Sequence, residues 1–115
     1  MRFGKVLAVA IGAGLLIAGT PAVASAASGE FTYQYVDGDG NVQLGFLADP
    51  PSRECVTLPE VADTDASLPA DSPRNFTDST AVVFTGPDCD GDYFSLRPFK
   101  GYGSERLKLR SVLFS

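Results

Sequence analysis

Residues 82–114 restrict the possible folds more than any other part of the chain. Short runs of β-branched and aromatic residues alternate there with turns rich in Gly and Asp, and a cysteine lies between them. Such runs between turn signals are typical of β-strands, because helices need longer periodic segments. The last run, residues 107–114, alternates and becomes apolar on both faces toward its end, which predicts a central position in a sheet. We therefore expect an all-β fold.

The N-terminal segment, residues 1–27, has the features of a secretory signal peptide. Arg2 and Lys5 precede an apolar run over residues 6–18, and small residues follow it. This run is shorter than the ~20 apolar residues that a spanning helix needs. We expect cleavage of this segment, a secreted protein and no membrane span in the mature form.

Cleavage can follow Ala24, Ala26 or Ala27, and we predict the site before Ser28. The mature chain, residues 28–115, then suffices for one β-rich domain and is too short for a second core. The sequence is acidic, with 14 Asp and Glu against 9 Lys and Arg and a formal net charge of −5. General electrostatic attraction to nucleic acid or to an anionic membrane is therefore not expected.

Two cysteines remain after cleavage, Cys55 and Cys89. In an oxidising compartment they allow one intramolecular pairing, so we predict a disulfide between them. Closing a loop of about 35 residues should stabilise the fold by roughly 3 to 4 kcal/mol in the chain-entropy model. Two thiolates without histidine cannot form a closed zinc shell, and we predict no cofactor.

The pattern over residues 31–46 predicts a β-hairpin, because apolar residues alternate on both sides of an Asp-Gly-Asp-Gly-Asn turn. One face of this hairpin carries three aromatic residues to bury. The turn also places Asp37, Asp39 and Asn41 as in the start of an EF-hand loop, but Val42 and Ala48 occupy the positions that need Gly and Glu. A plain turn and a weak, non-EF calcium site both remain open.

Residues 59–79 hold three prolines, five carboxylates and few apolar residues, which predicts a long irregular acidic loop. Connections of this length are uncommon in compact domains and are either functional or mobile. The loop is therefore either a solvated connection or an exposed recognition loop. Asn75 and Thr77 within it form an N-glycosylation pattern, to which we assign no role.

Residues 84–111 resemble a βγ-crystallin-type Greek key motif, through the spacing of Phe84 and Gly91 and a late serine, Ser111. Cys89 stands where the motif has its second aromatic residue. The resemblance implies a small antiparallel Greek key sandwich or barrel with one disulfide. It also implies that Phe84 fills the core, that Gly91 has a backbone conformation opposed by a Cβ, and that Ser111 ties a folded-over hairpin to the last strand.

The calcium positions of that family are occupied here by Arg106 and Leu107, which argues against its calcium site. A second acidic turn could still gather oxygen ligands for a metal, although solvated turn carboxylates are the favoured interpretation. The metal candidates of the two turns are Asp37, Asp39, Asn41, Asp88, Asp90 and Asp92.

Basic residues concentrate in the C-terminal part of the chain: Arg97, Lys100, Arg106, Lys108 and Arg110. We expect them to face acidic loops of the same domain, with a basic recognition patch as the alternative. Phe99 and Tyr102 flank Lys100, and aromatic residues beside a cation are common interface anchors. The candidate recognition residues are therefore Phe99, Lys100 and Tyr102, although the two rings could instead cover the small core.

The mature chain has no histidine, no free thiol once the disulfide forms and no serine in a nucleophile elbow. We predict no catalytic residues and a non-catalytic binding module instead. Its partner would be an extracellular protein or a cell-wall component. Similarity to small secreted actinomycete proteins with one Greek key domain implies a peptidase inhibitor or an antimicrobial toxin. A weakly calcium-binding or structural, envelope-associated protein is the remaining alternative.

Overall fold

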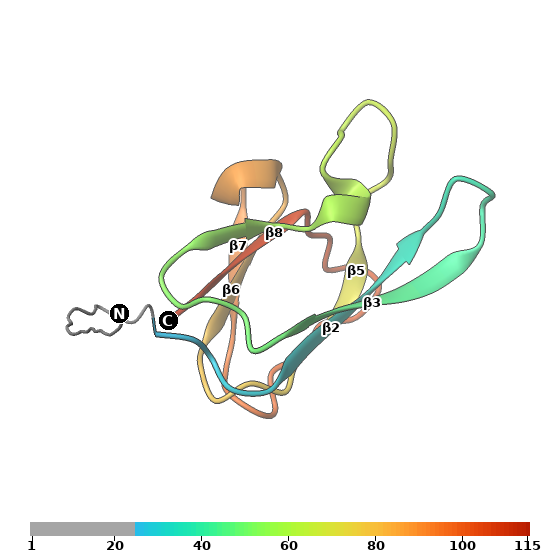
Figure 1. The fold of residues 1–115 in the computed structure, drawn as a ribbon. Helices are drawn as coiled ribbons and strands as arrows, with labels where there is room; N and C mark the ends of the chain where they lie inside the picture. The colour runs from blue at the N-terminus through green and yellow to red at the C-terminus, as the bar shows by residue number, and fades with distance from the viewer. Residues whose placement is uncertain (1–24) are drawn as a thin grey trace, which may run out of the picture.

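The computed structural model describes residues 25–115 and shows two antiparallel β-sheets facing each other (Figure 1). The prediction of an all-β fold is confirmed. One sheet has the strand order β3-β2-β5, with β2 Glu30–Val36, β3 Val42–Ala48 and β5 Asp71–Asn75. The other has the order β4-β8-β6-β7, with β4 Cys55–Thr57, β6 Ala81–Phe84, β7 Tyr93–Leu96 and β8 Ser111–Phe114.

Two short 3-10 helices complete the described elements, η1 Pro59–Val61 and η2 Pro87–Cys89. No helix within residues 25–115 has the length and apolar character needed to span a membrane. The predicted signal peptide falls largely on residues 1–24 and thus lies outside the described residues.

The core lies between the two sheets and is filled by alternate strand residues and by residues of the connecting segments. Phe31 of β2 meets Phe114 of β8 edge to face, with ring centroids 5.4 Å apart and planes at 84°. Such T-shaped pairs match the positive ring edge to the negative ring face. The remaining buried apolar residues are Ala27, Tyr33, Leu58, Val61, Ala70, Ala81, Val83, Leu96, Leu109 and Val112.

The predicted hairpin is confirmed, because β2 pairs with β3 through seven consecutive residue pairs from Glu30 and Ala48 to Val36 and Val42. Phe31 and Tyr33 are buried, and Tyr35 packs partly against the core. The apolar residues of β3 behave differently, since they pair with the outward-facing positions of β2. Val42, Leu44 and Phe46 therefore lie on the solvent face of the sheet.

The predicted disulfide between Cys55 and Cys89 is present and joins β4 to η2. Beside it, the Ser111 hydroxyl donates a hydrogen bond to the Gly86 carbonyl at 2.6 Å and accepts one from the Cys89 N–H at 2.8 Å. The predicted tie between the folded-over hairpin and the last strand is thus in place. Gly91 has φ +88°, and a Cβ there would meet the Thr85 hydroxyl, as predicted.

The predicted core position of Phe84 is wrong. Because strand residues alternate between faces, Val83 points into the core and Phe84 points away from it. Phe84 is half-buried and its ring packs on Tyr93 of β7, with centroids 6.1 Å apart. The final strand is also shorter than predicted, but its apolar end lies between β4 and β6, which confirms its central position.

Residues 59–79 are not one irregular loop, contrary to the prediction. They contain η1 and β5, and β5 pairs with β2 although it includes Pro73. Asn75 holds this region together: its Nδ2 donates to the carbonyls of Ser79, Leu96 and Arg97, and its Oδ1 accepts from Thr77 N–H and Oγ1. Both residues of the glycosylation pattern are buried.

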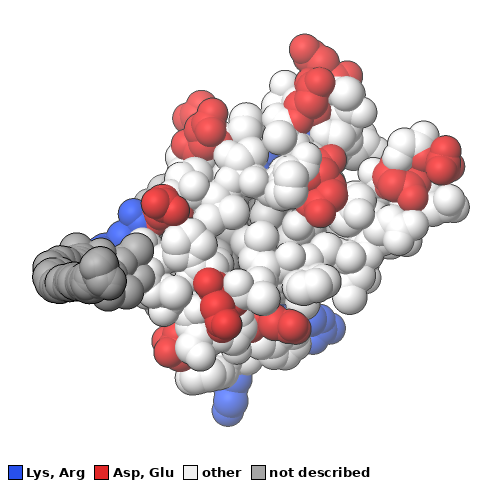
Figure 2. Space-filling model, viewed as in Figure 1, with Lys and Arg blue, Asp and Glu red and all other residues white. Residues whose placement is uncertain are grey.

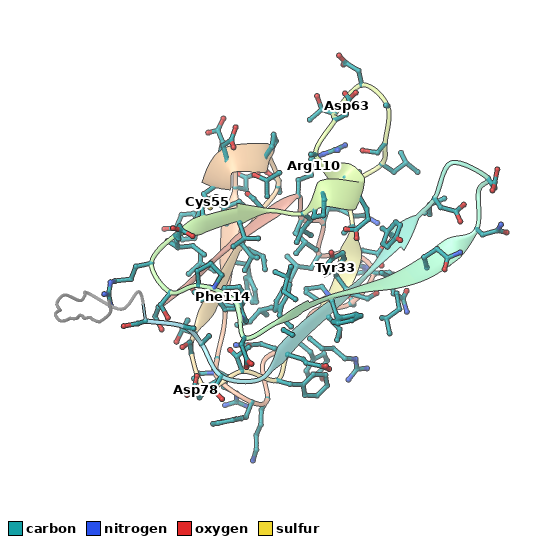
Figure 3. The ribbon with its side chains drawn as sticks, in the orientation of Figure 1. Tyr33, Cys55, Asp63, Asp78, Arg110 and Phe114 are labelled. Carbon is teal, nitrogen blue, oxygen red and sulfur yellow. A yellow bond between two sulfur atoms is a disulfide. The ribbon has the colours of Figure 1, made fainter. Side chains whose placement is uncertain are left out.

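Within residues 59–79, the loop between η1 and β5, residues 62–70, projects from the body of the domain (Figure 1). We call this segment the acidic loop. Arg110, which is 8% exposed, reaches beneath this loop (Figure 3). Its guanidinium donates to the carbonyls of Val61 and Ser67, each at 2.8 Å. A single buried cation bound to backbone carbonyls therefore fixes the base of the acidic loop.

The first described residues pack onto the domain. Ala27 is fully buried, its N–H donates to the Pro50 carbonyl at 2.8 Å, and the Ser25 carbonyl accepts from Ser52 N–H at 2.9 Å. Residues 25–27 lie before the predicted cleavage site at Ser28. Cleavage there would remove these contacts, whereas cleavage after Ala24 would keep them.

Candidate recognition surface

The segment between β7 and β8 carries the predicted recognition residues and runs along the outer edge of β5. Asn75 N–H donates to the Gly101 carbonyl at 2.8 Å, and Gly103 N–H donates to the Pro73 carbonyl at 2.9 Å. These bonds place Tyr102 directly opposite Arg74. Residues facing each other in an antiparallel pair point to the same side, so Tyr102 extends the outward face of the three-stranded sheet.

Tyr102 is 68% exposed and is positioned by a cation from the neighbouring strand. The Arg74 guanidinium carbon lies 5.8 Å from the Tyr102 ring centroid. At an exposed site such a contact contributes ~0.5 to 1 kcal/mol. The contact holds the ring in one orientation without covering it.

Two adjoining shallow hollows flank Tyr102 and share it with Phe94 of β7. The first has a volume of about 270 Å³ and is lined by Phe94, Ser95, Leu96, Arg97, Lys100, Gly101 and Tyr102. The second has a volume of about 320 Å³ and is lined by Phe94, Tyr102, Gly103, Ser104, Arg106 and Leu107. Each hollow thus combines two aromatic rings with at least one cationic side chain. We call this region, centred on Phe94, Lys100 and Tyr102, the aromatic-basic surface.

Phe99 lines neither hollow, so its side chain does not belong to the surface to which Lys100 and Tyr102 contribute. It is 61% exposed and stands in a tight turn with φ +64°. The turn is fixed by Phe99 N–H bonding the Thr77 carbonyl and by Gly101 N–H bonding the Arg97 carbonyl. Both Phe99 and Tyr102 lie outside the core, which removes the alternative that their rings cover it.

The basic residues do not, as a group, face acidic loops. Within residues 25–115 only Lys108 forms an ion pair, with Asp71 at 3.6 Å. Arg110 reaches the acidic loop, as predicted, but binds its carbonyls and not its carboxylates. Arg97 and Lys100, together with Arg106, thus leave their charges available at the aromatic-basic surface.

Acidic residues form several separate patches on the visible surface (Figure 2). In the view of Figure 2 they are spread over the tips of the hairpin and of the acidic loop, and Lys and Arg are visible mainly along the lower and left margins. Acidic and basic residues are therefore separated in space as well as along the sequence. An approaching anionic group would be steered toward the basic margin.

The metal candidates in the hairpin turn serve the turn itself. Asp37 Oδ1 accepts from the N–H groups of Asp39 and Asn41, each at 2.9 Å, and its Oδ2 accepts from Gln43 Nε2 at 3.0 Å. The Asn41 backbone bond is the main cause that lowers the pKa of Asp37, followed by the Gln43 bond. The carboxylate therefore acts as an acceptor for the turn.

The second acidic turn is held mainly through its backbone groups. Asp88 N–H donates to Thr57 Oγ1 at 2.9 Å, and Asp92 N–H donates to Thr85 Oγ1 at 3.0 Å. Asp90 bonds Gly86 through its backbone carbonyl at 2.9 Å. Among residues 25–115 no group of three acidic, histidine or cysteine residues is placed to hold a metal ion.

A buried tyrosine and a glutamate form a separate polar pair between the hairpin and η1. The Tyr33 hydroxyl donates to Glu60 Oε1 at 2.7 Å, and Tyr33 lies beside the core in Figure 3. Burial and then the bond to Glu60 raise the pKa of Tyr33. A phenol that resists ionisation is suited to holding two elements together and unsuited to proton abstraction.

Sequence reasoning missed two residues of the aromatic-basic surface. For Phe94 the sequence predicted only that it lies in a β-strand. Its side chain is exposed because β7 is an edge strand, in which residues 93–95 are all exposed. Arg74 lay in a stretch predicted to be irregular, so nothing in the sequence indicated its pairing with Tyr102. The signal that could have identified Phe94 is its position in an aromatic pair with Tyr93, one ring on each face.

No family model, curated protein or solved structure matches the chain.

Proposed function

We propose that the protein is a secreted, non-catalytic binding module that docks an extracellular protein through the aromatic-basic surface. The observation that carries this proposal is the joint exposure of Phe94, Lys100 and Tyr102 around two adjoining hollows. Aromatic rings supply large contact area at low entropic cost, and cations beside them select acidic groups on a partner. Acidic groups on the rest of the surface would repel the same acidic partner.

A peptidase inhibitor is the specific form of this function that the turn beside the surface supports. Phe99 and Lys100 stand on a turn that is closed by two backbone hydrogen bonds and begins with Pro98. A positive φ at a residue with a side chain costs ~1 to 2 kcal/mol, so the surrounding bonds hold the turn in this shape. A loop that is already ordered loses less entropy on entering a peptidase cleft.

Secretion is supported by the disulfide, because such bonds persist in oxidising compartments. The burial of Ala27 favours cleavage after Ala24 over the site before Ser28. N-terminal sequencing of protein from culture fluid should therefore begin at Ser25. A start at Ser28, with unchanged thermal stability relative to a chain starting at Ser25, would contradict this expectation.

The test of binding is capture of a partner by immobilised protein from the producer's culture fluid and cell-wall fraction. The variants Lys100→Glu and Tyr102→Ser should each reduce capture at least tenfold while leaving thermal unfolding unchanged, because both side chains are exposed. Phe99→Ser tests the turn separately. Leu68→Ser is the matched control, since Leu68 is 66% exposed on the acidic loop.

Three outcomes separate the forms of the hypothesis. Recovery of a peptidase that the protein inhibits supports inhibition, and loss of inhibition in Phe99→Ser assigns the turn to the cleft. Recovery of glycan supports binding to the envelope. Capture that survives both Lys100→Glu and Tyr102→Ser, or that depends on Leu68, contradicts the aromatic-basic surface as the site.

A further inference from the structure

The outward face of β3 exposes three apolar side chains in a row. Val42, Leu44 and Phe46 are 67%, 66% and 60% exposed, and they occupy alternate positions of an edge strand. Single exposed apolar residues are ordinary, whereas a contiguous row marks a contact surface. The row shares the outward face of the three-stranded sheet with Tyr102 but lies at the opposite edge, so β2 and β5 separate it from the aromatic-basic surface.

The outward direction of this row is fixed by specific contacts. On the inward face of β3, Gly45 leaves room for the Tyr33 ring, whose Cζ would lie 2.6 Å from a Cβ at that position. At the turn between β2 and β3, the Asp37 carboxylate accepts hydrogen bonds from the N–H groups of Asp39 and Asn41 and so fixes the shape of the turn. A slip of one residue would turn the apolar row inward but would drive a side chain into Tyr33.

The three residues of the apolar row also have backbone N–H and C=O groups that no other segment of residues 25–115 pairs. Asp37 N–H bonds the Asn41 carbonyl and Asp49 N–H bonds the Gly29 carbonyl, both in the register of the hairpin. Hydrogen-bonded and non-bonded pairs alternate in an antiparallel ladder, so Gln43 and Gly45 bond to β2. The N–H and C=O groups of Val42, Leu44 and Phe46 therefore point to the open edge, and no other segment of residues 25–115 pairs with them.

We propose that β3 pairs antiparallel with β3 of a second copy of this chain, which joins the two three-stranded sheets into one. Antiparallel pairing of identical strands has two-fold symmetry, so the same groups supply donors and acceptors on both sides. In the register that sets Leu44 beside Phe46 of the second copy, the apolar rows of both copies meet on one face. This proposal does not depend on the proposed function.

Charge favours a second copy as the occupant. Residues 42–48 contain no charged residue and no proline, the features with which edge strands usually prevent pairing. In the same register Asn41 of one copy faces Asp49 of the other, so an amide meets a carboxylate and no like charges are opposed. An unrelated peptide would find no charge on this strand to select it.

The assembly closes at two copies. Pairing occupies the β3 edge of both chains, and the other edge of this sheet is already covered, because residues 101–104 bond to β5. Within the described residues, both edge strands of the three-stranded sheet, β3 and β5, are then occupied, which leaves no strand edge of this sheet for a third copy. The contact is as long as one seven-residue strand, which is small among stable interfaces, so we expect a dimer that dissociates in the micromolar range.

Analytical ultracentrifugation of the purified, processed protein over a concentration series tests this proposal. We expect a shift from monomer to dimer as the concentration rises, and no larger species. Leu44→Lys should lower the association at least tenfold. Leu68→Lys is the matched control, because Leu68 is equally exposed at 66% but lies outside the sheet, and it should leave the association unchanged.

Amide hydrogen exchange provides a readout that does not require a variant. At low concentration Gln43 and Gly45 should be protected, and Val42, Leu44 and Phe46 should exchange freely; at high concentration all five should be protected. Leu44→Pro removes only the outward N–H and should abolish the dimer. A monomer at every concentration, or a dimer in which Leu44 and Phe46 stay unprotected, overturns the proposal.

Discussion

The two edge strands of the three-stranded sheet are held in opposite ways. β5 has a partner on each side, β2 on one and residues 101–104 on the other, and it ends in the buried Asn75. β3 pairs with β2 alone, and its apolar row faces solvent. The difference shows that buried polar contacts, more than apolar content, determine which edge of this sheet is closed.

The same contrast assigns different roles to the two edges. A strand enclosed by hydrogen bonds on both sides contributes to stability and is costly to change. A strand with free backbone groups and exposed apolar side chains contributes contact surface and can be changed with little effect on folding.

The largest effect is expected from the disulfide, which joins β4 of the other sheet to η2. Replacing both Cys55 and Cys89 with Ser should lower the free energy of unfolding by about 3 to 4 kcal/mol, because the unfolded chain regains the freedom of a long loop. Urea unfolding measures this change. If the variant unfolds at the parent's urea concentration, the bond does not stabilise the fold and the difference between the sheets needs another cause.

The next effect tests the closed edge directly. Asn75→Ala removes a side chain that makes five hydrogen bonds, among them a buried bond to the Leu96 carbonyl, so we expect a loss of about 3 kcal/mol. Gln43→Ala on β3 is the matched amide control. It gives up one exposed bond to Asp37 and should cost less than about 0.5 kcal/mol. Equal losses in the two variants would contradict the comparison.

A third test concerns the inward face of β3. Gly45→Ala places a methyl group against the Tyr33 ring and should cost about 2 kcal/mol, within the range for overpacked cores. Gly38→Ala in the hairpin turn is the control, because a Cβ there has no neighbour within 4 Å. Thermal unfolding of both variants separates them. A neutral Gly45→Ala would mean that Tyr33 does not fix the register.

The smallest expected effect is a pH dependence of stability caused by Tyr33, which can be measured only above pH 10. Its pKa is raised in the folded state, so the unfolded chain loses this proton first, above its ordinary pKa of 10.0. The resulting stability is fully present below pH 10 and is lost as the pH rises further. Tyr33→Phe should flatten the fall of stability above pH 10, as measured by urea unfolding across that range. An unchanged slope would contradict the burial and bonding assigned to this phenol.

Local patterns in the sequence were sufficient for one part of the fold. The hairpin, the presence of short strands within residues 82–114 and the disulfide follow from alternation, turn residues and cysteine number, each of which acts over a short stretch or a single pair. The position of Gly91 and the bonds of Ser111 also agree with what the Greek key resemblance implies. These features required no knowledge of which strands meet.

The rest depended on contacts between distant segments. β5 has the sequence Asp-Ser-Pro-Arg-Asn, which has low strand propensity, and it exists because β2 and residues 101–104 enclose it. Consequently its Arg74 could not be assigned to the candidate surface, and Phe99 could not be separated from Tyr102. Phe84 was misplaced for a related reason, since alternation alone does not say which face meets the core.

The enclosure of Asn75 has a consequence for how the protein can be produced. Asn75, Phe76 and Thr77 form the acceptor pattern that oligosaccharide-transferring enzymes recognise. In the folded domain the amide nitrogen is occupied by three carbonyls, so attachment could occur only on the nascent chain. A sugar there would take the place of the bonds that close β5. Expression in cells that lack this modification should yield the native domain, whereas a glycosylating host should accumulate modified chains that cannot complete folding.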